Sequence, residues 1–153
     1  MTAAEAIRHP ENLKGTHIVV VGGGETGCET AVFLAMDKGM DVTLLGRRNR
    51  LAPSAGPIAE SALMKHLQQY VKKIYINTEC VEIRERSLIC RQGANTAELP
   101  ADTVILASGM KEIPETAELF HNCAAEFLCI GDSNEVGNVR TAVRQGYDTA
   151  LNV

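Results

Sequence analysis

Short apolar runs alternate along the chain with stretches in which apolar residues recur at helical spacing. Residues 17–21 (HIVVV), 42–45 (VTLL) and 103–106 (TVIL) are continuous runs of apolar or β-branched residues. Such runs are typical of strands that are buried on both faces of a parallel sheet. Residues 73–77 (KIYIN) predict a further parallel strand of the same sheet.

Two helices are predicted between these strands. In the first helix, one face collects the apolar residues Cys28, Ala31, Val32, Ala35 and Met36. Gly39 follows at the place where a left-handed cap would end this helix. In the second helix, residues 57–71, an apolar residue recurs every four positions and a proline occupies the first turn. Strand, helix and strand in this order make a βαβ unit.

The remaining segments follow other patterns. Residues 80–84, 87–91 and 97–99 predict an antiparallel β-meander. Residues 127–130 predict a last short strand, and the apolar stripe after Gly137 predicts a helix that reaches almost to the C-terminus. The whole pattern predicts an α/β fold of three layers, with a parallel sheet and the meander as its crossover.

A glycine-rich turn, G-x-G-x-x-G, follows the first buried strand and opens the first helix. Gly22 permits a tight turn, Gly24 lets the backbone approach a pyrophosphate, and Gly27 lets the helix pack closely against the strand. The first helical turn, with Glu25 and Thr26, would offer its N–H groups and a positive dipole end to the phosphates. The motif therefore predicts a dinucleotide site, and the alternative is a turn without a ligand.

The end of the second strand bears on which dinucleotide is bound. An acidic residue there would hold the adenosine ribose hydroxyls, but the chain has Gly46 followed by Arg47, Arg48 and Arg50. Guanidinium groups can pair with a 2′-phosphate, so the sequence favours NADPH over NADH. The alternative is that these arginines form a solvated charge cluster, which leaves NADH open.

The strand at residues 103–106 ends in small residues that leave room above the edge of the sheet. This is where ligands bind in open α/β folds. The residues are Ala107, Ser108 and Gly109.

Composition and charge exclude several classes of function. The net charge of −4 argues against a nucleic-acid-binding surface. No apolar run reaches the roughly 20 residues of a membrane span, and the N-terminus lacks the layout of a signal peptide, so a cytoplasmic protein is expected. The five cysteines show neither a C-x-x-C pair nor metal-ligand spacing, and we expect free thiols and no metal.

Three motifs together resemble the pyridine-nucleotide part of the two-dinucleotide flavoprotein oxidoreductases. They are the segment VVVGGGETGCETAVFLAMDKGMDVTLLGRR, then ADTVILASG, then CIGDSNEVGNVRTAVRQGYDTAL. The resemblance is to the type that includes the NADH:flavin oxidoreductases, 2,4-dienoyl-CoA reductase and trimethylamine dehydrogenase. It implies a Rossmann-like FAD/NAD(P)-binding fold in which residues 1–15 form a linker, residues 16–109 the NAD(P)H-binding domain, and residues 110–153 a returning segment of an FAD-binding domain.

The resemblance also implies roles for particular residues. Gly131 and Asp132 match the Gly-Asp pair whose aspartate contacts the ribityl chain of FAD, and Glu29 matches a glutamate near the nicotinamide and the flavin. The alternatives are that Asp132 is an ordinary cap or turn residue and that Glu29 is a first-turn carboxylate that complements the helix dipole.

The expected function is to hold NAD(P)H for hydride transfer to FAD, within a fragment of a larger enzyme. A first glycine motif, a C-x-x-x-x-C redox pair and an iron–sulfur cysteine cluster are not found in the sequence. The implied partners are the rest of the FAD domain and a substrate-bearing domain, and a homo-oligomer stays open. No residue of the chain is nominated for proton transfer, since the cofactors carry the chemistry.

Two alternatives belong to other classes. A non-catalytic nucleotide-sensing module would use the glycine turn but would give Gly131 and Asp132 no task. A self-contained NAD(P)-dependent dehydrogenase would need a proton relay, and none of the three tyrosines shows Y-x-x-x-K spacing.

Overall fold

The computed structural model describes residues 1–152, which divide into two compact units, residues 1–109 and residues 110–152. The elements of the first unit are α1 (Ala3–Arg8), η1 (Pro10–Asn12), β1 (His17–Val21), α2 (Glu25–Val32), η2 (Phe33–Asp37), β2 (Asp41–Leu45), α3 (Pro57–Tyr70), β3 (Lys73–Tyr75), β4 (Glu79–Ile83), β5 (Ser87–Gln92), β6 (Asn95–Pro100) and β7 (Thr103–Leu106). The elements of the second unit are α4 (Pro114–Glu118), η3 (Gly131–Ser133) and α5 (Val139–Ala150).

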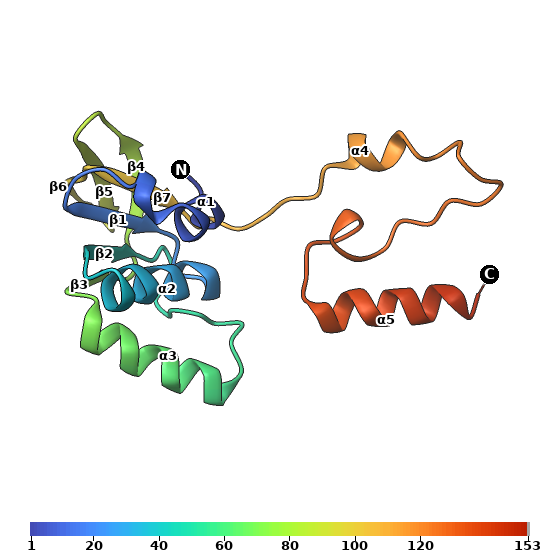
Figure 1. Cartoon of the computed structure of the whole chain (residues 1–153), viewed down its shortest axis with the longest axis horizontal. Coiled ribbons are helices and arrows are strands. Elements are labelled where there is room, and N and C mark those ends of the chain that lie inside the picture. The colour runs from blue at the N-terminus through green and yellow to red at the C-terminus, as the bar shows by residue number, and fades with distance from the viewer. Residues whose placement is uncertain (153) are drawn as a thin grey trace. The chain divides into compact units, whose positions relative to one another are not determined.

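The first unit has the three layers that the sequence predicts. Its middle layer is a parallel sheet in the order β3-β2-β1-β7, and a second, antiparallel sheet is formed by β4-β5-β6. Helices α2 and α3 cover one face of the parallel sheet, and the meander lies on the other face (Figure 1). The predicted fold class is therefore confirmed.

Each face of the parallel sheet has its own apolar core. Alternate residues of a strand point to opposite faces, so Ile18 and Val20 of β1 join the helices, whereas Val19 packs with Leu88 of the meander. Because both faces are covered, β1 contains no polar residue between Ile18 and Val21, and this explains why its sequence shows no alternation.

Residues 1–15 are predicted to form a linker, but part of this segment belongs to the core of the first unit. Residues Ala3–Arg8 form helix α1, and Ala3 and Ala6 are buried in the helix-side core. A reciprocal capping box between Thr2 and Glu5 stabilises this short helix. The T-x-x-E spacing was the available signal.

The predicted buried face of α2 is wrong at its last position. Met36 is 41% exposed, whereas Leu34 is fully buried. The helix continues as the π-helical turn η2, and this wider turn changes which side chains face the sheet. Gly39 has the positive φ expected of it, +66°.

Two predicted strands differ from the structure. Strand β3 ends at Tyr75 rather than at residue 77, because Asn77 adopts a left-handed conformation with φ of +52°. Residues 127–130 form no strand, and no strand occurs elsewhere among the described residues of the second unit with which they could pair. An isolated extended segment has no partner for its backbone hydrogen bonds.

None of the helices in residues 1–152 has the length and apolar character that crossing a membrane requires.

Candidate functional site: the glycine turn and the arginine loop

The glycine turn lies at the carboxyl edge of the parallel sheet, where β1 is flanked by β2 and β7. The N–H of Gly22 donates to the carbonyl of Leu45 at 2.9 Å, and the N–H of Ala107 donates to the carbonyl of Val21 at 2.8 Å. The turn is thus hydrogen-bonded to the ends of both neighbouring strands. This is the edge at which open α/β sheets bind their ligands.

Two of the three motif glycines are required by the packing of the chain itself. Gly22 has φ of +134°, and a Cβ there would overlap the carbonyl oxygen of Ala107. A Cβ on Gly27 would overlap the carbonyl oxygen of Gly22, because the first turn of α2 packs directly on the glycine turn. These two positions would have to be glycine whether or not a ligand were bound.

Gly24 is different, because nothing in the fold requires a glycine there. Its φ of −75° and ψ of 178° suit any residue, and apart from Gly24 and its two chain neighbours no described residue has an atom within 4 Å of the place that a Cβ would occupy. Gly24 is the N-cap of α2, a position at which Ser, Thr, Asp or Asn would accept a hydrogen bond from the first turn. The chain therefore leaves open, and uncapped, the position where the motif predicts a pyrophosphate.

The other residues predicted on α2 lie in different turns. Glu25, half-buried, and Thr26, exposed, belong to the first turn, so their backbone N–H groups face the open space above Gly24. Glu29 is exposed and lies one turn further along the helix. The alternative interpretation of Glu29 as the first-turn carboxylate is therefore wrong, since Glu25 holds that place.

The loop after β2 is fixed to the segment that joins β3 to β4. The N–H of Gly46 donates to Tyr75 at 2.8 Å, the N–H of Thr78 donates to Gly46 at 2.9 Å, and the N–H of Asn77 donates to Arg48 at 3.0 Å. We call residues 46–48 the arginine loop. Its backbone is held at three points while the side chains of Arg47 and Arg48 are exposed.

Arg50 does not share this arrangement. Its guanidinium group donates to both carboxylate oxygens of Glu60 on α3, at 2.9 and 2.5 Å. The sequence grouped Arg50 with the two preceding arginines as a phosphate ligand, but in the structure its charge is already paired. Two guanidinium groups, not three, remain for a phosphate at this edge.

Sequence reasoning missed a second support of the turn. The N–H of Ala52 donates to the carbonyl of Gly23 at 2.8 Å, and Leu51 and Ala52 are buried in this contact. Ala52 has φ of +43°, which is uncommon for a residue with a side chain. The bond joins residues far apart in sequence, and alanine carries no signal for it.

The residues after β7 border the turn on its other side. Ala107 is half-buried against Gly22, while Ser108 and Gly109 are exposed, and Gly109 has φ of +105°. These three small residues lie at the carboxyl edge of the sheet next to the glycine turn, and their role in leaving room for a ligand stays a prediction.

The second unit has its own ordered turn around the predicted Gly131–Asp132 pair. Gly131 has φ of +64° and donates its N–H to the side chain of Gln145 at 2.6 Å. One carboxylate oxygen of Asp132 accepts the N–H of Gly137 at 3.1 Å, so Asp132 does act as a turn residue. Helix α5 follows with an apolar stripe that is exposed in this unit: Val139, Val143, Tyr147 and Leu151.

The thiol nearest the glycine turn, that of Cys28, is unreactive. Cys28 is buried in α2, and burial raises the pKa of its thiol to about 11. A thiol with that pKa is almost entirely protonated at neutral pH and is a poor nucleophile. All five cysteines are free in the structure.

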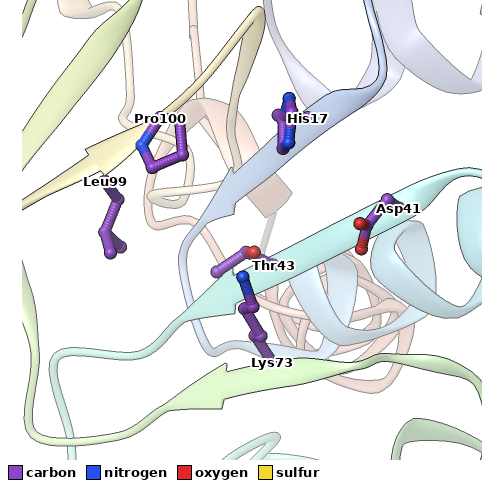
Figure 2. A pocket seen from close by; sticks show the side chains of 6 residues that line it. All are labelled: His17, Asp41, Thr43, Lys73, Leu99 and Pro100. Carbon is purple, nitrogen blue, oxygen red and sulfur yellow. The ribbon is translucent and has the colours of Figure 1, made fainter.

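A small polar hollow lies at the opposite, amino edge of the same sheet. Figure 2 shows its side chains, which include His17, Asp41 and Lys73 from the first residues of three parallel strands. Two of these side chains have partners: His17 contacts Asp102 at 3.2 Å, and Asp41 contacts Lys72 at 3.6 Å. Within residues 1–152, no group of three or more His, Cys, Asp or Glu side chains could hold a metal ion.

Comparison with known proteins agrees with this geometry. The pyridine nucleotide-disulphide oxidoreductase family matches residues 1–146. The chain is 26% identical to a metal reductase of Desulforamulus reducens, over 90% of this chain and 25% of the relative. It is also 26% identical to a bilirubin reductase of Mediterraneibacter gnavus, over 90% of this chain and 21% of the relative.

The fold has a close counterpart among solved structures. A complex of 2-naphthoyl-CoA reductase with 2-naphthoyl-CoA superposes with a TM-score of 0.86 and 21% identity, covering 100% of this chain and 23% of the other. The chain thus spans about a quarter of the length of the proteins it matches. The resemblance inferred from the motifs is confirmed, and the chain belongs to the pyridine nucleotide-disulphide oxidoreductase family.

Proposed function

We propose that this chain holds NAD(P)H at the glycine turn and positions it for hydride transfer to FAD in a larger flavoprotein reductase. The observation that carries the proposal is Gly24, the one motif glycine for which the fold gives no internal reason. The space above it is open, and the uncapped first turn of α2 faces that space. A dinucleotide pyrophosphate accounts for both features.

The residues of the turn would bind the cofactor rather than react with it. Backbone N–H groups of Glu25 and Thr26 would donate to the phosphate oxygens, and the dipole of α2 would favour their negative charge. When bound, the nicotinamide supplies a hydride from C4 and the flavin accepts it. The chain would contribute orientation, and the small residues Ala107–Gly109 would let the cofactor lie along the edge of the sheet.

The arginine loop supports NADPH over NADH as the bound form. Arg47 and Arg48 are exposed on a backbone that three hydrogen bonds hold in place. Guanidinium groups on a fixed loop can form charged hydrogen bonds with a 2′-phosphate without ordering the loop backbone on binding.

The flavin would be held elsewhere in the longer protein, with a contribution from the second unit. The exposed Asp132 has one carboxylate oxygen bonded within its own turn, and the apolar stripe of α5 has no cover within this unit. Both features suit a segment that completes an FAD-binding domain, in line with the reductase names of the relatives.

Calorimetric titration of the chain with adenosine 2′,5′-bisphosphate and with AMP tests the cofactor preference. We expect the bisphosphate to bind more tightly, and the double variant Arg47→Ala/Arg48→Ala to lose that advantage. Charged hydrogen bonds contribute about 1.5–3 kcal/mol each, so the loss is roughly tenfold or more.

The matched control is Arg84→Ala/Arg86→Ala, which removes two exposed arginines from the β4–β5 turn. Equal or weaker binding of the bisphosphate by the unaltered chain would overturn the NADPH preference. An equal loss of affinity for the bisphosphate in both double variants would overturn it too, since it would show that the overall charge of the chain, and not the arginine loop, sets the preference.

A further inference from the structure

The arginine loop has a neighbour that belongs to no nucleotide-binding motif, the first residue of β4. The backbone bonds from Asn77 and Thr78 to the loop bring residues 77–79 alongside residues 46–48. Glu79 therefore follows directly on the two residues that are bonded to the loop, and the charge of Arg47 reaches its carboxyl group. At the end of β2, where an acidic residue is usual, this chain has Gly46. Glu79 is an acidic residue near the same edge of the sheet, but it belongs to β4.

The Glu79 carboxylate already has a hydrogen-bond partner on the neighbouring strand β5. It is the register partner of Arg91 on β5, and the Arg91 guanidinium donates to a Glu79 carboxylate oxygen at 2.8 Å. The hydrogen bond from Arg91, and more weakly the charge of Arg47, hold the pKa of the Glu79 carboxyl below its ordinary value. The Glu79 carboxylate is thus hydrogen-bonded to Arg91, and the charge of Arg47 acts on it without a hydrogen bond between the two.

This arrangement decides how much positive charge the arginine loop can offer. While Arg91 neutralises Glu79, Arg47 stays available for a phosphate. Without Arg91, the carboxylate would turn to Arg47 and would also stand ready to accept the ribose hydroxyls of NADH, the role that acidic residues have in NADH sites. Resting on the proposed function, we propose that the Glu79–Arg91 pair sets the choice between the 2′-phosphate and the 2′-hydroxyl form of the dinucleotide.

The test is the ratio of NADH to NADPH dissociation constants, because the two cofactors differ only at the 2′ position. The variants are Glu79→Gln, Arg91→Gln and the double variant. We expect Arg91→Gln to lower the preference for NADPH about two- to fivefold, the usual range for an exposed charge pair. We expect Glu79→Gln to raise the preference by a similar factor.

The double variant separates an indirect from a direct role of Arg91. If Arg91 acts through Glu79, the double variant binds both cofactors as Glu79→Gln does. If Arg91→Gln weakens NADPH binding by the same factor whether or not Glu79 has been replaced, then Arg91 contacts the phosphate itself and the proposal is wrong.

Arg84→Gln is the matched control, because Arg84 pairs with Glu82 of β4 at 3.0 Å and is not bonded to Glu79. An equal shift in the ratio for Arg84→Gln and Arg91→Gln would overturn the proposal in favour of a general charge effect. An unchanged ratio in all variants would overturn it too, while leaving cofactor binding intact. If the unaltered chain binds neither cofactor, the proposed function itself fails, and this inference fails with it.

Discussion

Replacing Gly24 separates a glycine that the fold needs from a glycine that the ligand needs. The two perturbations are Gly24→Ala and Gly24→Ser, with Gly22→Ala as the comparison. A Cβ at Gly24 meets no described residue within 4 Å other than its chain neighbours, and its backbone angles suit any residue. A Cβ at Gly22 meets the carbonyl oxygen of Ala107, on a backbone with φ of +134°.

The expected changes in the free energy of unfolding follow from these surroundings. Alanine is a poorer N-cap than glycine, so Gly24→Ala should cost about 0.5–1 kcal/mol, whereas Gly24→Ser should be neutral or stabilising by a few tenths. Gly22→Ala combines about 1–3 kcal/mol of backbone strain with an overlap that forces the β7 end to move. A loss of about 3 kcal/mol or more is expected there, a large fraction of the stability of an ordinary domain.

The Gly24 variants, which should change stability little, should have a large effect on the binding of NADPH. A side chain at Gly24 enters the space assigned to the pyrophosphate, so both Gly24 variants should bind NADPH at least about tenfold more weakly, a loss of about 1.4 kcal/mol. Urea unfolding followed by circular dichroism measures stability, since the chain has no tryptophan for fluorescence. Calorimetry measures binding. If Gly24→Ser folds normally and binds NADPH as tightly as the unaltered chain, the reasoning about the glycine turn is refuted.

Three further predictions concern stability and reactivity. The backbone amide at the start of β1 holds the pKa of the Asp102 carboxyl below its ordinary value, so its stabilising contribution is complete above the unfolded pKa of about 3.9. This contribution is lost as the pH falls through the lower pKa of the folded state. Urea unfolding midpoints measured from pH 7 to pH 2 should therefore fall less steeply in Asp102→Asn than in the unaltered chain. An equal fall of the midpoints in both would count against the hydrogen bonds to Asp102. Iodoacetamide at pH 8 should alkylate the exposed Cys123 of the folded chain and spare the buried Cys28, and mass spectrometry would disprove this by finding both labelled at one rate. Ile105→Ala, in the core, should lower the free energy of unfolding by about 2–5 kcal/mol. Ile58→Ala, at an 89% exposed position, should change it by less than about 0.5 kcal/mol. Similar losses of stability in the two variants would show that the assigned core is wrong.

The sequence predicts most of the first unit because its strands and helices carry local signals. The buried strands read as continuous apolar runs, and the glycine turn lies between the first of them and an amphipathic helix. Gly22 and Gly27 could be assigned correctly because strand–turn–helix geometry requires them in that order.

The features that could not be predicted depend on contacts between distant residues or on small changes in helix geometry. The π-helical turn that buries Leu34 instead of Met36 has no sequence signature. The pairing of Arg50 with Glu60 depends on how α3 packs beside the loop. The contact between Glu79 and Arg91 depends on the register of the β4–β5 hairpin. A β-bulge between Cys80 and Glu82 shifts that register next to the pair.

The second unit was harder to predict because its apolar residues lack a local partner. Residues 127–130 have the composition of a strand, but a strand also needs a neighbour to accept and donate its backbone hydrogen bonds. The assignment of residues 110–153 to an FAD-binding domain stays a prediction.

The most direct test of the account is a two-dimensional NMR titration of the ¹⁵N-labelled chain with NADPH. The account predicts that the amide signals of residues 22–27 and of the arginine loop shift together with one dissociation constant. It also predicts that the amide signals of His17, Asp41 and Lys73, around the hollow at the amino edge of the sheet, stay in place. Shifts confined to that hollow, or no shifts at the glycine turn under saturating NADPH, would contradict the claim that this chain binds a nicotinamide dinucleotide there.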